Sequence, residues 1–261
     1  GVQTCALPIY NFCWPSCGDP RNLGGLVRAA EACLDGGLAY RTPFVSGKDS
    51  LNNQFSTEDG RTIRVPPTLL ISGMGIVEEE DLATSMDAKE AGSLLVLVGS
   101  TTDRLGGSHF VRVGGDVTVG ADELPVTDLE RGPRTAGAVA TAIRQGLVRS
   151  AHDASEGGVL VAAVEMAFSG GLGLSFDLDA IPTEGEVSPT ARAFAEDPSR
   201  YLLEIDAADL PRLAAILDGL PHAVVGEFKA DEHVTLGGAG IDPASAPASR
   251  FLDAWNRGCD R

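Results

Sequence analysis

The sequence predicts an α/β protein, and three observations carry that prediction. Segments with apolar residues at helical spacing alternate along the chain with short apolar runs of strand type. Only 5% of the residues are aromatic, so the core must be mainly aliphatic, and 32 glycines supply many tight turns. A chain of 261 residues is long enough for one or two such domains.

The first predicted elements are a helix, a polar loop and a strand. Apolar residues recur at helical spacing from Asp19 to Tyr40, and the Gly36-Gly37 pair predicts the stop of that helix. The stretch from Thr42 to Gln54 is polar and contains glycine, which indicates a loop. Residues 68–77 form an apolar run suited to a buried strand. We expect chemistry in the loop, where functional residues often lie.

A second series of elements follows the acidic segment 78–90, and we place the domain boundary near residue 88. The expected domains are therefore residues 10–87 and 88–261. In the second domain we predict helices over residues 135–145, 156–168 and 210–217, and a loop over residues 150–155. Strands are predicted near residues 94–98, 174–177, 201–205, 223–228 and 234–236.

Charge and cysteine content restrict the class of protein. The net charge of −17 opposes binding to nucleic acid or to an anionic membrane, although a divalent cation can bridge carboxylates and phosphates. Five irregularly placed cysteines indicate a reducing compartment, so we expect a cytoplasmic protein, and no apolar run approaches the ~20 residues of a membrane span. Cys13 and Cys17 have no second ligand pair after them, which favours free thiols over a zinc site.

Residues 1–9 show neither periodicity nor a capping pattern. They read like a translated sequencing adapter, so we expect a non-native segment joined to a truncated chain; the alternative is an irregular N-terminal loop.

The segment Ser46 to Asn53 combines groups that handle phosphate and metal. Gly47 lets a ligand approach the backbone, Lys48 can neutralise phosphate, and Asp49 offers a hard oxygen to Mg²⁺. The spacing is not that of a Walker A loop. The alternative is a hydrated polar turn.

The segment Ala151 to Gly158 precedes an almost wholly apolar helix. Ser155 is a suitable N-cap and Glu156 favours the helix dipole, which is a purely structural explanation. That explanation does not include His152 or Asp153. A helix N-terminus can also bind phosphate, with Asp153 holding the accompanying Mg²⁺. A glycine turn at Leu105–Ser108 is followed by His109, which has no partner in sequence to indicate a catalytic or metal role.

Taken together, these segments resemble the second half of the phosphoribosylformylglycinamidine synthase family, within the aminoimidazole ribonucleotide synthetase-like superfamily. The resemblance covers nearly all of residues 10–261. The blocks that carry it are residues 11–15, 42–44 with 46–53, 105–108, and 151–158 continuing into 163–168.

The resemblance implies a two-layer α/β architecture, with part of an N-terminal-type domain followed by a complete C-terminal-type domain. It implies an ATP-dependent ligase that forms formylglycinamidine ribonucleotide from formylglycinamide ribonucleotide and glutamine-derived ammonia, with Mg²⁺ on the phosphates. The implied partners are the missing first half of the enzyme and a glutaminase domain or subunit. We expect the 261-residue chain alone to be inactive.

The resemblance also implies roles for single residues. Gly47 matches a nucleotide-contacting glycine and Ser50 a substrate-contacting serine, while Lys48 stands where shorter family members have a magnesium-binding Asn. Asp153 matches a magnesium-binding carboxylate and Ser155 an ATP-contacting residue. No catalytic residue is assigned.

Two positions depart from the family pattern, and two other functions stay open. Tyr10 replaces an Asp associated with ATP contact, and Ser16-Cys17-Gly18 is an insertion. The chain could instead be a half that binds nucleotide structurally without turnover. Another synthetase or kinase of the superfamily is the third possibility, since one fold hosts several reactions.

Overall fold

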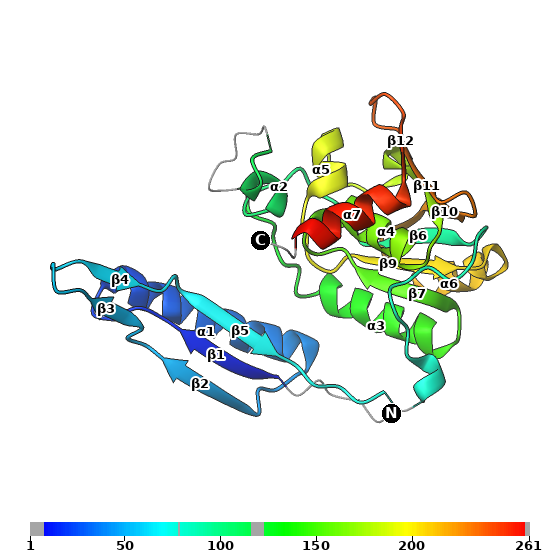
Figure 1. The fold of residues 1–261 in the computed structure, drawn as a ribbon. Helices are drawn as coiled ribbons and strands as arrows, with labels where there is room; N and C mark the ends of the chain where they lie inside the picture. The colour runs from blue at the N-terminus through cyan, green and yellow to red at the C-terminus, as the bar shows by residue number, and fades with distance from the viewer. Residues whose placement is uncertain (1–7, 78, 116–122, 259–261) are drawn as a thin grey trace. The chain divides into compact units, whose positions relative to one another are not determined.

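The computed structural model describes residues 8–77, 79–115 and 123–258 (Figure 1). The predicted non-native segment therefore falls mostly outside the described residues, because residues 1–7 lie there. The chain divides into two compact units after Glu80. Ala88 packs into the core of the second unit. The assignment of residues 10–87 and 88–261 as two domain types stays a prediction.

The first unit is a small α/β layer. Its three-stranded sheet has the order β2-β1-β5, in which β1 (Ile9–Cys13) pairs in parallel with β2 (Ser46–Ser50) and antiparallel with β5 (Thr68–Ser72). Helix α1 (Pro20–Tyr40) lies beside this sheet, and β3 (Gln54–Ser56) and β4 (Thr62–Arg64) form a separate hairpin (Figure 1). The predicted strand over residues 68–77 is present as β5 but ends at Ser72. The expectation that it is buried is wrong, because only Leu69 in it is partly buried and the other four residues are exposed.

The predicted helix of the first unit is confirmed, but its predicted stop is wrong. Asp19 caps the N-terminus, since its side chain accepts a hydrogen bond from the backbone N–H of Arg21 at 3.0 Å. The helix continues through the Gly36-Gly37 pair, because an interior glycine costs only about 1 kcal/mol of helix propensity. It ends where Arg41 turns left-handed (φ 54°) and its N–H bonds back to the last turn.

The block of residues 11–15 supplies the core of the first unit. Phe12 and Trp14 are buried, and the Trp14 indole donates to the backbone carbonyl of Asn22 in α1 at 2.8 Å. The insertion at residues 16–18 forms the turn that starts the helix, because the Ser16 carbonyl accepts from the side chain of Asn22 at 2.9 Å. These contacts join the strand β1 to the helix that follows it.

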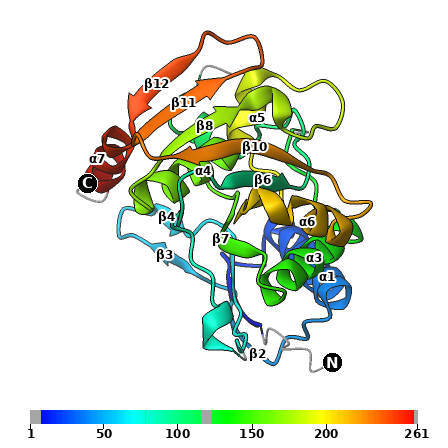
Figure 2. The ribbon, with the colours of Figure 1, turned by 90° about the vertical axis from the view of Figure 1, so that its right-hand side faces the viewer.

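The second unit contains a seven-stranded sheet of order β12-β11-β8-β10-β6-β9-β7. Figure 2 labels all of these strands except β9. Among the strand pairs of this sheet that the structure describes, the β8/β11 pair alone is parallel. The strands are β6 (Leu94–Val98), β7 (Val148–Asp153), β8 (Gly173–Asp177), β9 (Tyr201–Ile205), β10 (His222–Lys229), β11 (His233–Gly237) and β12 (Ala244–Pro247). The helices are α2 (His109–Arg112), α3 (Arg131–Arg144), α4 (Gly158–Ser169), α5 (Pro189–Phe194), α6 (Leu210–Ile216) and α7 (Ala248–Gly258). Short 3-10 turns lie at η1 (Glu80–Leu82), η2 (Leu178–Ala180) and η3 (Ala207–Asp209).

Strand β6 has a core on each of its faces. Leu95 and Leu97 pack in one apolar cluster with α4, whereas Val96 and Val98 pack in a second cluster with α3 and α6. This division follows from the alternation of side chains along a strand. The predicted α/β fold is confirmed, and in the second unit helices cover both faces of the sheet.

Candidate functional site

The predicted phosphate and metal loop of the first unit is partly a strand. Residues 46–50 form β2 and pair residue by residue with β1, so the loop prediction is wrong for this stretch. Backbone pairing with β1, rather than apolar side chains, fixes these polar residues in a strand. Side chains alternate along it, so Lys48 and Ser50 point to one face and Asp49 points to the other. The strand therefore separates the Lys48 ammonium from the Asp49 carboxylate.

Gly47 lies directly under the ring of Tyr10. The two residues are partners across β1 and β2, and a Cβ on Gly47 would overlap the Tyr10 ring. The same ring makes edge contacts with Phe12 and Phe44, with centroid distances of 5.3 and 5.7 Å. A glycine at this position is thus required by packing, independently of any ligand.

Asp153 ends strand β7 and projects a largely exposed carboxylate. Asp153 is the partner of Tyr201 in the antiparallel pair of β7 and β9, and its side chain is 64% exposed. A hydrogen bond from the Ser155 side chain holds the pKa of this carboxyl below its ordinary value, and the neighbouring His152 imidazole adds to the effect. Asp153 and Ser155 are therefore brought together as the sequence suggested, in an ionised, solvent-facing group that fits a hard cation.

His152 is held between two carboxylates. Its Nδ1 lies 3.3 Å from Asp153 Oδ1 and its Nε2 lies 3.0 Å from Glu165 Oε2 in α4. The hydrogen bond with Glu165 raises the pKa of His152, against the effect of burial. The sequence does not predict this contact, because Glu165 stands in an otherwise apolar helix. Glu165 reaches His152 only because α4 passes the end of β7.

The prediction of Ser155 as the N-cap of α4 is wrong, as is the start of that helix at Glu156. The helix begins at Gly158, after Gly157 in a left-handed conformation (φ 81°), and no side chain caps it. The Ser155 carbonyl accepts from the Gly158 N–H at 3.0 Å, so a glycine turn separates the serine from the helix. The Ser155 side chain bonds to Asp153 instead. The prediction of a loop over residues 150–155 is also wrong for residues 150–153, because these belong to β7.

The glycine turn at Leu105–Ser108 starts the short helix α2. Ser108 is its N-cap, with Oγ accepting from the Val111 N–H at 3.4 Å. His109 is paired: its Nδ1 lies 3.2 Å from Glu196 Oε1. Glu196 was not predicted, because a single Glu in a loop carries no local pattern.

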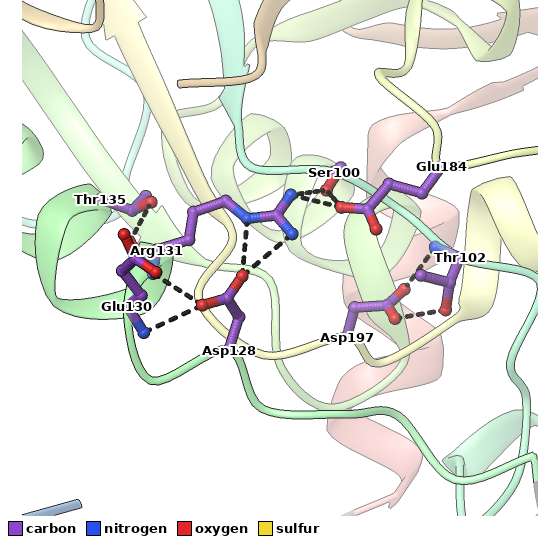
Figure 3. A network of polar contacts seen from close by, with 8 residues as sticks. All are labelled: Ser100, Thr102, Asp128, Glu130, Arg131, Thr135, Glu184 and Asp197. Carbon is purple, nitrogen blue, oxygen red and sulfur yellow. Dashed lines mark hydrogen bonds and ion pairs between the residues drawn. The ribbon is translucent and has the colours of Figure 1, made fainter. Parts of the chain in front are cut away.

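A cavity of about 320 Å³ opens beside the end of β6 and the start of α3. Its described lining contains none of the predicted site residues; it consists of Gly99, Ser100, Thr102, Arg104, Val126, Asp128, Arg131, Gly132, Thr135, Glu184, Asp197, Pro198 and Ser199. Figure 3 shows the Arg131 guanidinium between Asp128 and Glu184. Its Nε and Nη2 both donate to Asp128 Oδ2 at 3.1 Å, and Nη1 donates to Ser100 and Glu184. Because these N–H donors already bond to side chains of the protein, the Arg131 guanidinium lines the cavity without offering these donors to an anion.

Within residues 8–77, 79–115 and 123–258, no group of three or more His, Cys, Asp or Glu side chains is arranged to hold a metal ion. Cys13, Cys17 and Cys33 are free thiols. A cation at Asp153 would thus need further ligands, such as phosphate oxygens and water. None of the helices in these ranges is both long and apolar enough to cross a membrane.

Residues 90–238 match the sequence profile of the family described as AIR synthase related protein, C-terminal domain. This match is more than half of the chain. It includes the glycine turn at residues 105–108 and the segment 151–158.

Two relatives in sequence are phosphoribosylformylglycinamidine synthase subunits PurL. The one from Thermococcus sibiricus is 32% identical over 226 residues, which are 87% of this chain and 30% of the relative. The one from Deinococcus radiodurans is 34% identical over 218 residues, which are 81% of this chain and 28% of the relative. The chain thus spans less than a third of the length of these relatives, and the resemblance noted in the sequence is confirmed.

Solved structures from Thermotoga maritima share the fold. The PurLQS structure covers 95% of this chain and 38% of its own, with a TM-score of 0.71 at 20% identity. The structure of PurL complexed with FGAR covers 95% of this chain and 39% of its own, with a TM-score of 0.71 at 21% identity. The structure of PurL complexed with ATP covers 94% of this chain and 38% of its own, with a TM-score of 0.69 at 22% identity. At these identities the likeness shows the fold alone.

Proposed function

This chain belongs to the family of AIR synthase related proteins, and from that premise we propose that it is part of a phosphoribosylformylglycinamidine synthase. The observation that carries the proposal is the similarity to PurL subunits, at 32% and 34% identity over more than four fifths of the chain. A shared fold alone would not choose among the reactions of the superfamily.

The proposed reaction makes an amidine from an amide. ATP phosphorylates the amide oxygen of formylglycinamide ribonucleotide and turns it into a leaving group, and ammonia then attacks the activated carbon. The products are formylglycinamidine ribonucleotide, ADP and phosphate. Magnesium, when bound, offsets the charge that moves between the phosphates and the amide oxygen.

In the second unit, Asp153 would bind Mg²⁺ and Ser155 would contact ATP. The support is local: the Asp153 carboxylate is 64% exposed, and the Ser155 side chain keeps it ionised by lowering its pKa. The same hydrogen bond restricts the Asp153 rotamer, so less entropy is lost when a cation binds. The hydrogen bond between His152 and Glu165 joins this end of β7 to α4.

In the first unit, Gly47 and Lys48 would contact ATP and Ser50 would contact the substrate. Lys48 and Ser50 share a face of β2, which suits two groups acting on neighbouring ligands. The sequence also predicts that Asp49 binds Mg²⁺, and this stays a prediction. The Asp49 side chain points to the face of β2 opposite to Lys48 and Ser50. The Tyr10 ring must move before a nucleotide reaches the Gly47 backbone.

The partners follow from the length of the relatives. The chain corresponds to 30% of PurL from Thermococcus sibiricus, so the proposed active enzyme requires the remaining part of the synthase. Ammonia would come from a glutaminase domain or subunit, and the proposed location is the cytoplasm, where purine biosynthesis takes place.

Calorimetric titration of magnesium-ATP into the chain tests the proposal. We expect saturable binding that is lost when EDTA removes magnesium. Asp153→Asn should weaken it at least about tenfold, or about 1.4 kcal/mol, because the amide removes the charge that holds the cation. Asp218→Asn is the matched control, since Asp218 is an exposed carboxylate after α6 with no place in the proposal.

Two outcomes would contradict the proposal. Absence of binding by a folded chain would remove the nucleotide site, and equal affinity of Asp153→Asn and Asp218→Asn would remove the role of Asp153. A separate assay with ATP, ammonia and formylglycinamide ribonucleotide should detect no amidine from the chain alone. Turnover in that assay would show that the remaining part of the synthase is not required.

A further inference from the structure

The segment Phe194–Arg200 runs from the last residue of α5 to the start of β9 and contacts the candidate loops of the second unit. On the glycine-turn side, the Phe194 ring stacks on Phe110 with centroids 4.9 Å apart. On the Asp153 side, the Arg200 carbonyl accepts from the Ala154 N–H at 3.0 Å. The segment therefore lies where both loops are anchored.

Glu196 is the residue of this segment that binds both loops through one atom. Its Oε1 accepts from the His109 N–H at 2.8 Å and from the Gly157 N–H at 2.7 Å. The His109 imidazole lies 3.2 Å from the same oxygen. One carboxylate oxygen thus joins the start of α2 to the turn that connects Asp153 to α4.

Burial strengthens these contacts. The Glu196 side chain is 17% exposed, so its hydrogen bonds compete with little water. Charge-assisted hydrogen bonds from backbone N–H groups are roughly twice as strong as neutral ones. The Glu196 side chain therefore joins the two loops by accepting a hydrogen bond from a backbone N–H group of each.

The same segment is itself held rigidly. The buried Arg200 guanidinium donates to Thr101 Oγ1 at 2.8 Å and to the Asp197 carbonyl at 3.1 Å. Asp197 accepts from the Thr102 hydroxyl at 2.6 Å. Close packing adds to this, since a Cβ on Gly158 would lie 2.6 Å from the Ala195 carbonyl oxygen. These contacts therefore fix the backbone on both sides of Glu196.

We propose that Glu196 is a positioning residue of the magnesium-nucleotide site: it holds the Gly157 turn, and through it Asp153 and Ser155, in the geometry that binds a metal-nucleoside triphosphate. This inference rests on the proposed function. Glu196 touches neither ligand nor metal in this role. Its effect passes along three residues of backbone from Gly157 to Ser155 and Asp153.

The first test needs no ligand. Amide hydrogen exchange is measured in the wild-type chain, in Glu196→Ala, and in Glu186→Ala, which removes an exposed carboxylate ahead of α5. Glu196→Ala should lose protection at His109 and Gly157 by about tenfold or more, while the central strands β6 and β9 keep theirs. Unchanged protection at both amides would overturn the positioning role.

The second test measures magnesium-ATP affinity in the same variants. Glu196→Ala should bind at least about tenfold more weakly, and Glu196→Gln should stay within about threefold of wild type, because the amide oxygen still accepts from both backbone N–H groups. A residue that only stabilised the fold would lower the melting temperature without changing affinity at temperatures where the chain is folded. Wild-type affinity in Glu196→Ala would overturn the inference.

The two tests separate the inference from the proposed function. A wild-type chain that does not bind magnesium-ATP contradicts the proposed function, and the exchange measurement then decides whether Glu196 positions the Gly157 turn. A wild-type chain that binds, with all Glu196 variants equal to Glu186→Ala, contradicts the positioning role alone.

Discussion

Glu204, a fully buried carboxylate in β9, provides the sharpest test of how the second unit is held together. Its side chain is 0% exposed. Oε1 accepts from the N–H groups of Lys89 (3.0 Å) and Glu90 (2.9 Å) and from Ser93 Oγ (2.7 Å). Oε2 accepts from Lys89 N–H (2.8 Å) and Ser150 Oγ (2.7 Å). The carboxylate thus anchors the chain that leads into β6, and also strand β7.

The expected cost of removing it can be worked from these donors. In Glu204→Ala the two hydroxyls can rotate toward other acceptors, but the two backbone N–H groups cannot. Each buried donor left unpaired costs about 1–3 kcal/mol, and the cavity adds to this, so we expect a loss of about 3–6 kcal/mol. In Glu204→Gln one oxygen still faces the N–H groups and the new amide can donate to Ser150. The loss should then be about 1–3 kcal/mol.

Thermal unfolding followed by far-UV circular dichroism measures the difference. For a unit of this size 1 kcal/mol corresponds to about 2–4 °C, so the expected loss of about 3–6 kcal/mol in Glu204→Ala should lower the Tm of the second unit by about 6–24 °C. The exposed Glu186→Ala is the control and should stay within about 0.5 kcal/mol of wild type. A Tm for Glu204→Ala within about 2 °C of this control would refute the reasoning, because the donors would then have other partners.

Three further predictions test single contacts. Gly158→Ala should destabilise the second unit by about 1–3 kcal/mol in urea denaturation, since the residue has φ 75° and its Cβ would meet a carbonyl oxygen; wild-type stability would contradict this. Glu165→Gln should lower the pKa of His152 measured by NMR, and an unchanged value would show that another group raises it. Because that pKa is raised on folding, its stabilising effect is full below the unfolded value of about 6.5 and is lost as the pH rises through the folded pKa. Gly47→Ala should destabilise the first unit by about 1–3 kcal/mol, and less when Tyr10→Ala is also present, as a double-mutant cycle would show; an additive cycle would place the strain elsewhere.

The elements that the sequence predicted best are those whose pattern is local. Strands β6 and β9 have the predicted bounds because each is a short apolar run between polar residues. Their place in the sheet was not predictable in this way. Strand β6 lies between β9 and β10, more than 100 residues away in sequence, and short-range periodicity carries no signal for that pairing.

Polar strands were the main error, and they coincide with the candidate site. Residues 46–50 and 150–153 were predicted as loops because they are rich in Ser, Gly, Lys and Asp. Both are strands, since backbone hydrogen bonds to a neighbouring strand need no apolar side chain. Ser150 is even fully buried, because its hydroxyl donates to Glu204. The residue types pointed to Asp153 and Ser155 correctly as neighbours, but the turn between them and α4 depended on a tertiary contact with Glu196.

The two supporting carboxylates differ in how far the sequence could have identified them. Glu204 stands in the apolar run 201–205, where an unpaired charge would cost several kcal/mol, so its presence implies that donors surround it. Burial therefore predicts that Glu204 has hydrogen-bond donors around it, but not which residues supply them. The donors come from segments more than 50 residues away in sequence. Glu196 lies in a loop among Asp, Pro and Ser, where a glutamate is ordinarily solvated, so no rule of burial applies to it. Its role follows only once Phe194 and Arg200 fix its backbone beside both loops. The chemistry-bearing residues are therefore recognisable from their types, whereas the residues that set their geometry are recognisable only when burial makes them costly.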